Sequence, residues 1–343
     1  MLIACGALTV LLVSYLGVGR LSVWASEHGL LAIPGERSSH LVATPTGGGV
    51  VIAAVTILGV LCVWLIRSDW AIPGLAVYLI TAVFVAAVGW LDDFYALSAQ
   101  VRFGVQAAAA LVMMLWVGVF KGIDFFIFGD YTLGWIGYPL TFLWIVGLIN
   151  AYNFMDGIDG NAGGIGAAAG AMWALVAWRL NEPILVALGL LVSASSIGFL
   201  GHNWQPARIF MGDVGSTFLG FTFAAMPLLG LQGTGNTRLL VIGSLMVAPC
   251  ICDSVFTFLR RLLQGEPVFQ AHRTYLYQRL ATIGYPHWVG SGFYLLLSLA
   301  MGVCGWLYLI DEGILRWQLL VLVVFILTTQ VGVVHFAERR RKL

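Results

Sequence analysis

Charge is scarce in this sequence: only 10% of its 343 residues are Asp, Glu, Lys or Arg, whereas 60% are hydrophobic. The mean hydropathy of +0.94 lies far above that of soluble domains. No polar stretch is long enough for a large soluble domain, and there is no internal repeat or low-complexity tract. These absences exclude a water-soluble globular protein and indicate a polytopic membrane protein.

A strong charge of one sign is also missing, because 17 basic and 16 acidic residues give a net charge of +1. This balance gives no reason to expect nucleic acid as a partner. The first apolar run has no basic residue before it and no cleavage pattern after it, which favours a retained helix over a signal peptide. The cysteines lack the spacing of a disulfide framework or zinc site, so we expect buried free thiols at Cys5, Cys62, Cys250, Cys252 and Cys304.

Eleven apolar segments are long enough to cross a bilayer, which takes about 20 residues of helix. They predict an all-α membrane bundle that forms one domain over residues 1–343. The outer connection at 121–137 could form a hairpin or an interfacial segment. The predicted spans are 2–19, 48–66, 73–91, 103–120, 138–154, 163–179, 183–201, 214–230, 239–259, 288–309 and 315–336.

The basic residues distinguish the two sides of this predicted bundle. With the N-terminus outside, twelve Lys or Arg residues fall on the cytoplasmic side and five on the other. The positive-inside rule therefore predicts a periplasmic N-terminus and a cytoplasmic C-terminus. No carboxylate falls at a predicted mid-membrane position, where an ion-coupled transporter more often keeps one. We therefore expect chemistry at the cytoplasmic face.

Two of four polar clusters follow predicted spans. Asp92 and Asp93 end the third span, and neighbouring carboxylates repel unless a cation or basic group holds them. A solvated loop is an equally good interpretation of this pair. The second cluster, "NAYNFMDGIDG", offers Asn153 and Asp156 on one helical face, with amide and carboxylate oxygens that suit a hard cation. A calcium loop lacks its remaining ligands here, and a plain helix cap would not require two Asp and two Asn residues.

The other two clusters combine acidic, glycine and basic residues. In "GHNWQPARIFMGDVGSTFLG", Asp213 precedes an apolar helix, where it either caps the helix or faces a phosphate across a divalent cation. In "RRLLQGEPVFQAHRTYLYQRL", the basic residues could clamp phosphate or bind anionic lipid headgroups. Taken alone, the fourth cluster slightly favours the lipid alternative.

In this order, the four motifs resemble the polyprenyl-phosphate N-acetylhexosamine-1-phosphate transferase family, glycosyltransferase family 4. The resemblance runs from about residue 34 to residue 280, and the "ERSSH" and "HRTYLYQ" segments are most similar to O-antigen-initiating transferases of the Pseudomonas type. It implies transfer of an N-acetylhexosamine 1-phosphate from a UDP-sugar to undecaprenyl phosphate, with release of UMP. It also implies a bacterial inner-membrane protein in lipopolysaccharide or related cell-envelope synthesis, with a homodimer as an open alternative.

The resemblance also implies site residues. Asp213 is the expected principal Mg²⁺ ligand and Asn153 a second one, with Mn²⁺ as the alternative ion. Asp92 and Asp93 match a pair near the lipid phosphate and the diphosphate, and Asp156 joins the catalytic set without an assigned role. The basic motif adds His272 to this catalytic set.

Further positions match substrate contacts of the family. Asn203 and Phe210 correspond to contacts with uracil, and Asp159 to a neighbour of the uridine. The expected substrate-binding residues are Arg37, His40, Asn150, Gly157, Ile158, Asp159, Asn203, Arg208, Phe210 and Arg273.

Two departures from the family pattern limit what can be transferred. Thr46 in "ATPTGGG" replaces a family Arg, with Arg37 or His40 as candidates to replace its contact. Tyr275 and Tyr277 follow His272 where further histidines are common, and this loop is associated with sugar choice. The hexosamine therefore stays open.

We expect the lipid phosphate to attack in line with the UMP leaving group, with Asp92 orienting it or taking a residual proton. A route through a phosphorylated aspartate is the alternative. A transporter or flippase of lipid-linked sugars would instead spread polar positions along several mid-membrane helix faces, and a non-catalytic scaffold would leave the ordered Asp and Asn motifs unexplained.

Overall fold

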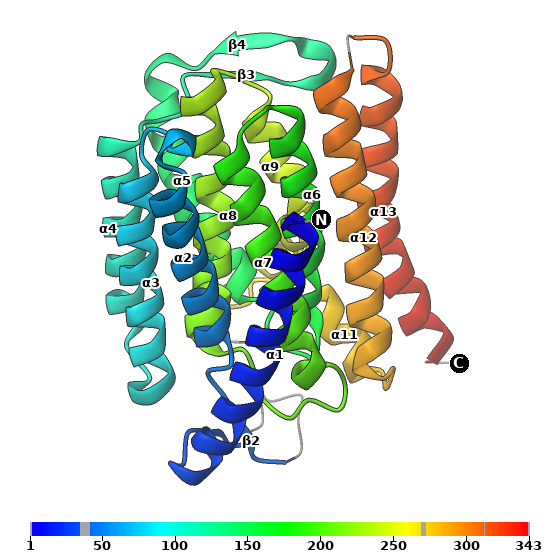
Figure 1. The fold of residues 1–343 in the computed structure, drawn as a ribbon. Helices are drawn as coiled ribbons and strands as arrows, with labels where there is room; N and C mark the ends of the chain where they lie inside the picture. Colours follow the sequence, from blue (N-terminus) through cyan, green and yellow to red (C-terminus); the bar gives the residue numbers. More distant parts are fainter. Residues whose placement is uncertain (1, 35–41, 269–271, 312, 342–343) are drawn as a thin grey trace.

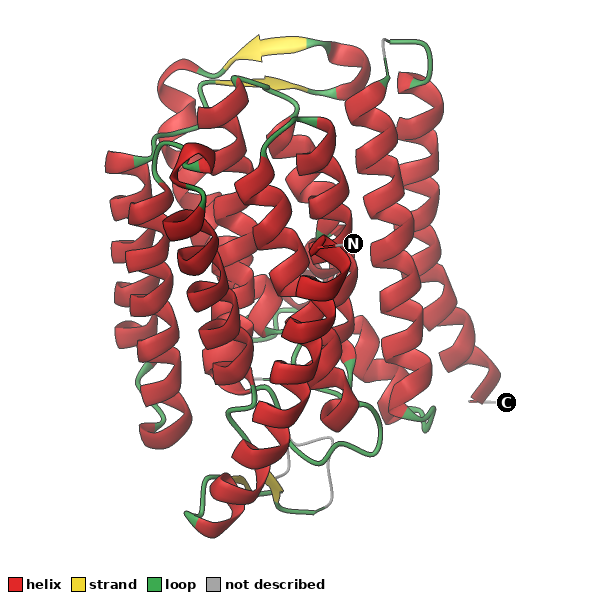
Figure 2. Cartoon of the chain, viewed as in Figure 1, coloured by secondary structure: helices red, strands yellow, loops and turns green. Residues whose placement is uncertain are grey.

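The computed structural model describes residues 2–34, 42–268, 272–311 and 313–341. These residues form an upright bundle of helices, as Figures 1 and 2 show, which satisfies the backbone hydrogen bonds of apolar segments internally. The helices are α1 (Leu2–Glu27), α2 (Gly49–Ile66), α3 (Leu75–Tyr95), α4 (Ala99–Trp116), α5 (Gly137–Asn153), α6 (Asn161–Arg179), α7 (Pro183–Asn203), α8 (Gly212–Thr234), α9 (Leu239–Met246), α10 (Ala248–Leu263), α11 (Leu276–Thr282), α12 (His287–Ile310) and α13 (Arg316–Arg341).

Two small antiparallel hairpins lie at opposite ends of the bundle (Figure 1). One pairs β1 (Leu31–Ala32) with β2 (Thr44–Pro45), and the other pairs β3 (Gly122–Asp124) with β4 (Asp130–Thr132). Of the two alternatives for 121–137, the hairpin is therefore the one that forms. We name the end with β3 and β4 the hairpin end, and the end where α3 and α5 finish and α8 begins the carboxylate end. Short 3-10 turns are η1 (Ser68–Trp70), η2 (Phe126–Phe128) and η3 (Gly134–Ile136).

The number of candidate membrane spans is smaller than predicted. Nine helices in the described ranges are long and apolar enough to cross a membrane, and ten if α9 and α10 count as one broken span, since they meet at 77°. The prediction of eleven spans was therefore too high. The segment predicted at 239–259 is divided at Val247, and the one predicted at 163–179 is helical but does not reach the required apolarity.

Composition and packing explain why α6 differs from the other long helices. It is rich in Gly and Ala, is buried along most of its length and packs mainly against α7 and α12. At Gly170, an added Cβ would lie 2.8 Å from the carbonyl oxygen of Gly189 on α7. Small residues permit this close backbone approach. A helix enclosed by protein needs little apolar surface for lipid, so the hydropathy of α6 is lower.

The centre of the bundle is α8, whose apolar window is 94% buried. It packs against α3 and α5, with further contacts to α2. The first turn of α8 therefore lies where the ends of several helices meet. The thiols of Cys62, Cys250, Cys252 and Cys304 are free, as predicted, and those of Cys250 and Cys304 are buried. The predicted burial is wrong for Cys62, which is exposed on α2, because an apolar membrane helix can face lipid instead of protein. The side chain of Cys5 lies outside the described part of the chain.

Candidate active site

Four carboxylates gather at the carboxylate end, from three separate parts of the chain. Asp92 and Asp93 lie in the last turn of α3, Asp213 in the first turn of α8, and Asp156 in the loop after α5. Gly89 lets α3 approach α8 closely, because an added Cβ there would lie 2.7 Å from the Cα of Val214. The helix packing thus brings residues 120 positions apart into direct contact.

Asp93 caps α8. One of its carboxylate oxygens accepts the N–H of Asp213 at 2.7 Å and the other accepts the N–H of Val214 at 3.2 Å. These are amides that a helix start leaves without an intrahelical partner. The alternative that Asp213 itself caps this helix is wrong, because Asp213 lies inside the first turn and a residue of another helix supplies the cap. The Asp213 side chain is left for other contacts.

Asp92 and Asp213 share one cation. Their carboxyl groups lie in hydrogen-bonding contact, and Arg102 reaches Asp92 at 3.5 Å and Asp213 at 3.8 Å. A second oxygen of Asp92 accepts the N–H of Leu97 at 2.7 Å. Two carboxylates in contact need a proton or a cation between them, and the Arg102 side chain is still 44% exposed.

Asp156 adds a third carboxyl group to this pair. It accepts the N–H of Gly212 and lies near Asp213 and Asp93. Burial raises the pKa of Asp156 well above the usual carboxyl range, and the negative charges of Asp213 and Asp93 raise it further. Each further negative charge in this group therefore costs free energy unless a proton or a cation accompanies it.

Asn153 lies beside Asp213, as expected for a common site. Its side chain hydrogen-bonds Asp213, and its Oδ1 accepts the hydroxyl of Ser216 at 2.6 Å. One turn earlier on α5, Asn150 forms an amide pair with Gln106 of α4, in which its Nδ2 donates at 2.6 Å. Asn150 thus joins α4 to α5 next to the carboxylates.

The donor set fits Mg²⁺. Carboxylate and amide oxygens are the ligands that hard cations prefer, and Mg²⁺ is usually held by one or two carboxylates together with substrate phosphates. Within the described ranges, no three His, Cys, Asp or Glu side chains form a complete metal cage. The contact between Asp92 and Asp213 gives the physical reason for a cation, because a single arginine does not balance the three carboxyl groups there.

Two loops meet next to the carboxylates. Asn203 joins them, since its Oδ1 accepts the N–H of Gly160 and its Nδ2 donates to the carbonyl of Ile209, both at 2.9 Å. Asp159 accepts the N–H of Ala207 at 3.0 Å, and His287 Nδ1 lies 3.2 Å from its other oxygen. Both predicted uridine neighbours hold the loops in place, and their contact with a nucleotide stays a prediction.

The glycine-rich segment at 43–49 packs against the same region. Phe210 is half-buried, donates its N–H to the carbonyl of Pro45 at 2.8 Å and accepts the N–H of Gly48 at 2.9 Å. A Cβ at Gly49 would overlap Gly215 of α8, which explains the need for glycine. The Arg208 side chain is exposed. The predicted contacts Arg37 and His40 lie outside the described residues.

The basic motif approaches the carboxylates through aromatic rings. The His272 ring packs on Tyr275 with centroids 4.7 Å apart, and Tyr275 stacks on Phe154 at 5.3 Å. Burial lowers the pKa of His272, as do the positive charges of Arg261 and Arg260. Arg273 is half-buried in the same loop. The fourth motif thus adjoins the loop that carries Asp156.

The loop after α5 also contacts α11. The Tyr277 hydroxyl donates to the carbonyl of Phe154 at 2.7 Å. A Cβ at Gly157 would overlap this hydroxyl, so the glycine permits the contact. Ile158 is buried next to Gly290 of α12. These two predicted substrate residues therefore lie where α11 and α12 meet the loop.

Sequence reasoning missed three residues that the fold brings to the site. His287 lies 128 positions from its partner Asp159, and nothing near "YPHW" marks it. Ser216 is one of many hydroxyl residues in apolar helices. Arg102 had a usable signal, because it follows Asp92 by ten residues after a helix start, and an arginine near an acidic pair is a candidate partner.

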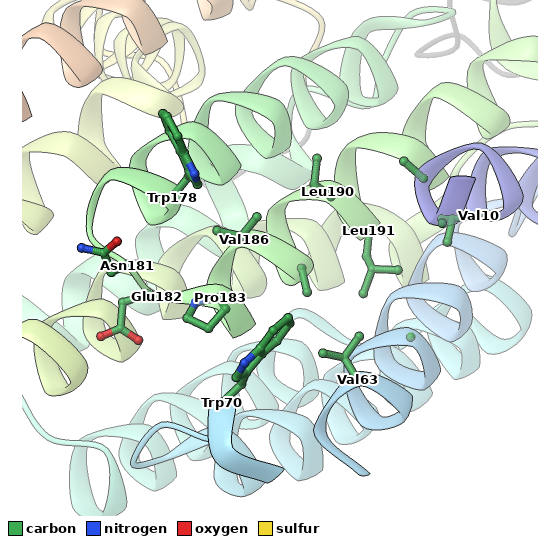
Figure 3. A pocket seen from close by; sticks show the side chains of 14 residues that line it. Val10, Val63, Trp70, Trp178, Asn181, Glu182, Pro183, Val186, Leu190 and Leu191 are labelled. Atoms are coloured by element: carbon green, nitrogen blue, oxygen red, sulfur yellow. The ribbon is translucent and has the colours of Figure 1, made fainter. Parts of the chain in front are cut away.

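A cavity of about 630 Å³ lies away from these groups, between α1, α2 and α7. Figure 3 shows its mostly apolar lining, which includes Trp70, Trp178 and Leu191, with Glu182 at one edge. Among the described residues that line the cavity, Glu182 is the one with a carboxylate. Because this cavity is mostly apolar, the carboxylate end, with its charged and polar contacts, is the better candidate for the active site.

These features define a multi-pass membrane protein whose acidic site lies at one end of a helical bundle. Residues 75–231 match the model of "Glycosyl transferase family 4". A "Probable undecaprenyl-phosphate N-acetylglucosaminyl 1-phosphate transferase" of Bacillus subtilis (strain 168) is 34% identical over 284 residues, covering 82% of this chain and 76% of the relative.

Two further relatives have names of the same kind. An "Undecaprenyl-phosphate alpha-N-acetylglucosaminyl 1-phosphate transferase" of Salmonella typhi is 31% identical, over 76% of this chain and 71% of the relative. A "Decaprenyl-phosphate N-acetylglucosaminephosphotransferase" of Mycobacterium leprae (strain TN) is 29% identical, over 83% of this chain and 78% of the relative. The chain belongs to glycosyl transferase family 4 and is a phosphoglycosyltransferase.

Proposed function

We propose that this enzyme transfers N-acetylglucosamine 1-phosphate from UDP-N-acetylglucosamine to undecaprenyl phosphate and releases UMP. The observation that carries the proposal is the group of Asp92, Asp156 and Asp213, in which Arg102 is the one cation that the described residues bring to Asp92 and Asp213. Such a site suits a metal-bound diphosphate. The choice of N-acetylglucosamine, which the sequence left open, is supported by the three relatives, since each of them is named for transfer of this sugar phosphate.

Asp213 and Asn153 are the proposed ligands of Mg²⁺, with Mn²⁺ as the alternative ion, and Asp92 lies in reach of the same position. When bound, Mg²⁺ supplies the positive charge that screens the diphosphate and the departing UMP. Ser216 fixes the Asn153 amide through its hydrogen bond. Arg102 lies where it can approach the phosphates of either substrate, since it already contacts both Asp92 and Asp213.

The contacts of the acidic pair support direct displacement. An oxygen of the lipid phosphate forms a bond to the sugar-linked phosphorus, while the bond from that phosphorus to the bridging oxygen breaks and UMP leaves with this oxygen. Asp92 orients the lipid phosphate or takes its residual proton. Asp93 is a poor covalent nucleophile, because both of its carboxylate oxygens accept amides of α8. If labelled phosphosugar became attached to the enzyme without a lipid acceptor, the direct route would be wrong.

We further propose that the carboxylate end faces the cytoplasm, which makes the N-terminus periplasmic and the protein one of the bacterial inner membrane. The described basic residues at this end outnumber those at the hairpin end, in line with the positive-inside rule. Those at the carboxylate end are Arg20, Arg102, Arg208, Arg260, Arg261, Arg273, Arg279, Arg339, Arg340 and Arg341, and those at the hairpin end are Arg67, Lys121, Arg179, Arg238 and Arg316. An Asp130→Cys variant tests this orientation, because residue 130 lies at the hairpin end. A membrane-impermeant thiol reagent should label it in intact spheroplasts, whereas labelling only after lysis would mean that the hairpin end faces the cytoplasm.

The product of this reaction is the lipid diphosphate sugar that begins a cell-envelope glycan. The "ERSSH" and "HRTYLYQ" segments extend this proposal to O-antigen of lipopolysaccharide. Complementation of a strain that lacks its O-antigen-initiating transferase tests the assignment. Restored O-antigen supports it, and in vitro activity without restoration points to another envelope glycan.

Purified protein tests the activity itself. With magnesium, undecaprenyl phosphate and UDP-N-acetylglucosamine, we expect UMP release that depends on the lipid and is lost in Asp213→Asn. Asp69→Asn is the matched control, because Asp69 is an exposed partner of Arg67 at the hairpin end. No UMP release with any UDP-N-acetylhexosamine would count against the proposal.

A further inference from the structure

A second buried carboxylate lies near the active site without belonging to it. Asp253 of α10 is fully buried and accepts four hydrogen bonds. The donors are the N–H of Leu276 at 2.7 Å, the N–H of Tyr277 at 3.3 Å, the hydroxyl of Thr257 at 3.1 Å and the hydroxyl of Tyr294 at 2.5 Å. Two of these donors are the first amides of α11.

The chemistry of this pocket requires a carboxylate. All four partners of Asp253 are donors, so an amide in its place would direct an NH₂ group at one of them. The residue at the start of α11, Tyr275, makes no side-chain cap of its own. Asp253 therefore supplies from another helix the cap that α11 lacks.

The cap is held from two more helices. Tyr294 of α12 donates to Asp253, and Gln330 of α13 in turn donates to the Tyr294 hydroxyl at 3.0 Å. Gln330 is fully buried and lies 3.0 Å from the carbonyl of Pro249 at the start of α10. The position of α11 thus depends on α10, α12 and α13 together.

What α11 positions is the active-site loop. Tyr277 and Gln278 occupy the space next to Gly157, where an added Cβ would lie 2.6 Å from the Gln278 amide nitrogen. Tyr277 also holds the carbonyl of Phe154. On the other side of the cap, the carbonyl of Thr274 accepts from Arg260 at 3.3 Å. One buried carboxylate therefore connects the loop of Asp156 with the loop of His272.

We propose that Asp253 is a positioning residue for the transfer reaction. It fixes the start of α11 so that the loop at 154–160 and the loop at 272–275 form one substrate site. The inference rests on the proposed function where it assigns the first of these loops to the UDP-sugar. Asp253 acts through Tyr277 and the backbone, and does not contact substrate.

The test compares two matched tyrosines of α12. Tyr294→Phe removes the donor to Asp253, whereas Tyr308→Phe removes an equally buried hydroxyl that donates to the Asp124 carbonyl at 2.9 Å at the hairpin end. We expect the KM for UDP-N-acetylglucosamine to rise about tenfold in Tyr294→Phe, a ratio that matches the loss of one hydrogen bond to a carboxylate. The KM of Tyr308→Phe should stay within about twofold of wild type.

Asp253→Asn should raise this KM further, and amide hydrogen exchange should accelerate over residues 276–283 and 154–160 in both site variants but not in Tyr308→Phe. If Asp253→Asn does not fold, the comparison of Tyr294→Phe with Tyr308→Phe still tests the proposal. Equal effects of the two tyrosine variants on KM and exchange would reduce Asp253 to a general stability role and overturn the proposal. Wild-type protein without UMP release would contradict the proposed function instead, while the exchange measurement would still test the link from Asp253 to the loop.

Discussion

The two ends of the bundle use buried aspartates in opposite ways. At the hairpin end, Asp124 is 3% exposed and receives Arg238 at 2.9 Å and Arg316 at 3.0 Å. At the carboxylate end, Arg102 contacts Asp92 at 3.5 Å and Asp213 at 3.8 Å, and Asp156 lies near Asp213. The first arrangement pairs two cations with Asp124 and with Asp311, which lies 3.9 Å from Arg316. Among the described residues, the second has one cation for three carboxyl groups.

This difference distinguishes the ion pairs of the hairpin end from the proposed active site. Arg238 also donates to the carbonyls of Tyr308 and Asp311, so the group at the hairpin end joins β3 to α9 and α12 and leaves little to bind. The carboxylate end retains unbalanced charge, which costs stability unless a ligand neutralises it. A protein keeps such an arrangement where a cation and an anionic substrate are to bind.

The largest expected effect is on activity at the carboxylate end. Asp213→Asn should lower UMP release by about a thousandfold, or about 4 kcal/mol of transition-state stabilisation, because it removes the proposed principal metal ligand. The same change should leave the thermal unfolding midpoint equal or higher in magnesium-free buffer, since it reduces repulsion with Asp92 and Asp156. Unfolding followed by scanning fluorimetry checks this. A lower midpoint would mean that the carboxylates stabilise each other and would weaken the comparison.

Next in size is a loss of stability at the hairpin end. Asp124→Asn should destabilise the protein by about 3 kcal/mol, because it removes the buried counter-charge of Arg238 and leaves Arg316 with the more distant Asp311, at 3.9 Å. UMP release per folded molecule should stay unchanged. Unfolding in detergent together with an activity assay on the folded fraction measures both quantities. A specific loss of activity would show that the hairpin end influences the site.

Magnesium should stabilise the protein by binding at the carboxylate end and not at the hairpin end. Its addition should raise the stability of the wild type by about 1–2 kcal/mol at concentrations well above the dissociation constant, through preferential binding to the folded state. Asp213→Asn should abolish this increase and Asp69→Asn should retain it. Calcium-free magnesium titrations followed by thermal unfolding provide the measurement. An equal increase in Asp213→Asn would place the bound ion elsewhere.

The smallest expected effect concerns pH. Since the pKa of His272 is lowered in the folded state, chiefly by burial, the unfolded chain binds a proton more readily there. Its contribution to stability is therefore present above the unfolded pKa of about 6.5 and is lost as the pH falls through that value toward the folded one. His272→Gln should flatten the decline in unfolding midpoint between pH 7 and pH 5. An unchanged slope would mean that other groups account for it.

Much of the architecture follows from local sequence. Helix positions and free thiols were predicted, and a hairpin was one of two alternatives for 121–137, because apolar runs of the right length and turn residues are local properties. The break between α9 and α10 at Val247 accounts for part of the error in the number of spans, and α6 accounts for the rest. Its Gly and Ala residues look apolar enough for lipid, but their small size instead lets α6 pack closely against α7 and α12.

The site was only partly predictable, because contacts between separate helices are not a local property of the sequence. Motif order brought Asp92, Asp93, Asp156 and Asp213 together as candidates, and the fold brings them into one cluster. The different contacts that each of these carboxylates makes were not predictable. Asp92 and Asp93 are neighbours in sequence, yet one faces Arg102 and the other caps α8.

A membrane helical bundle follows from the residues alone, and the residues also predict the face on which the polar motifs gather and an oxygen-rich site, because hydrophobic length, charge bias and residue type are readable one segment at a time. Helix packing assigns the separate roles of the carboxylates: one caps a helix, one shares a cation, and Asp253 holds a distant helix start. Those roles depend on the distances between side chains from separate helices, and helix packing sets these distances.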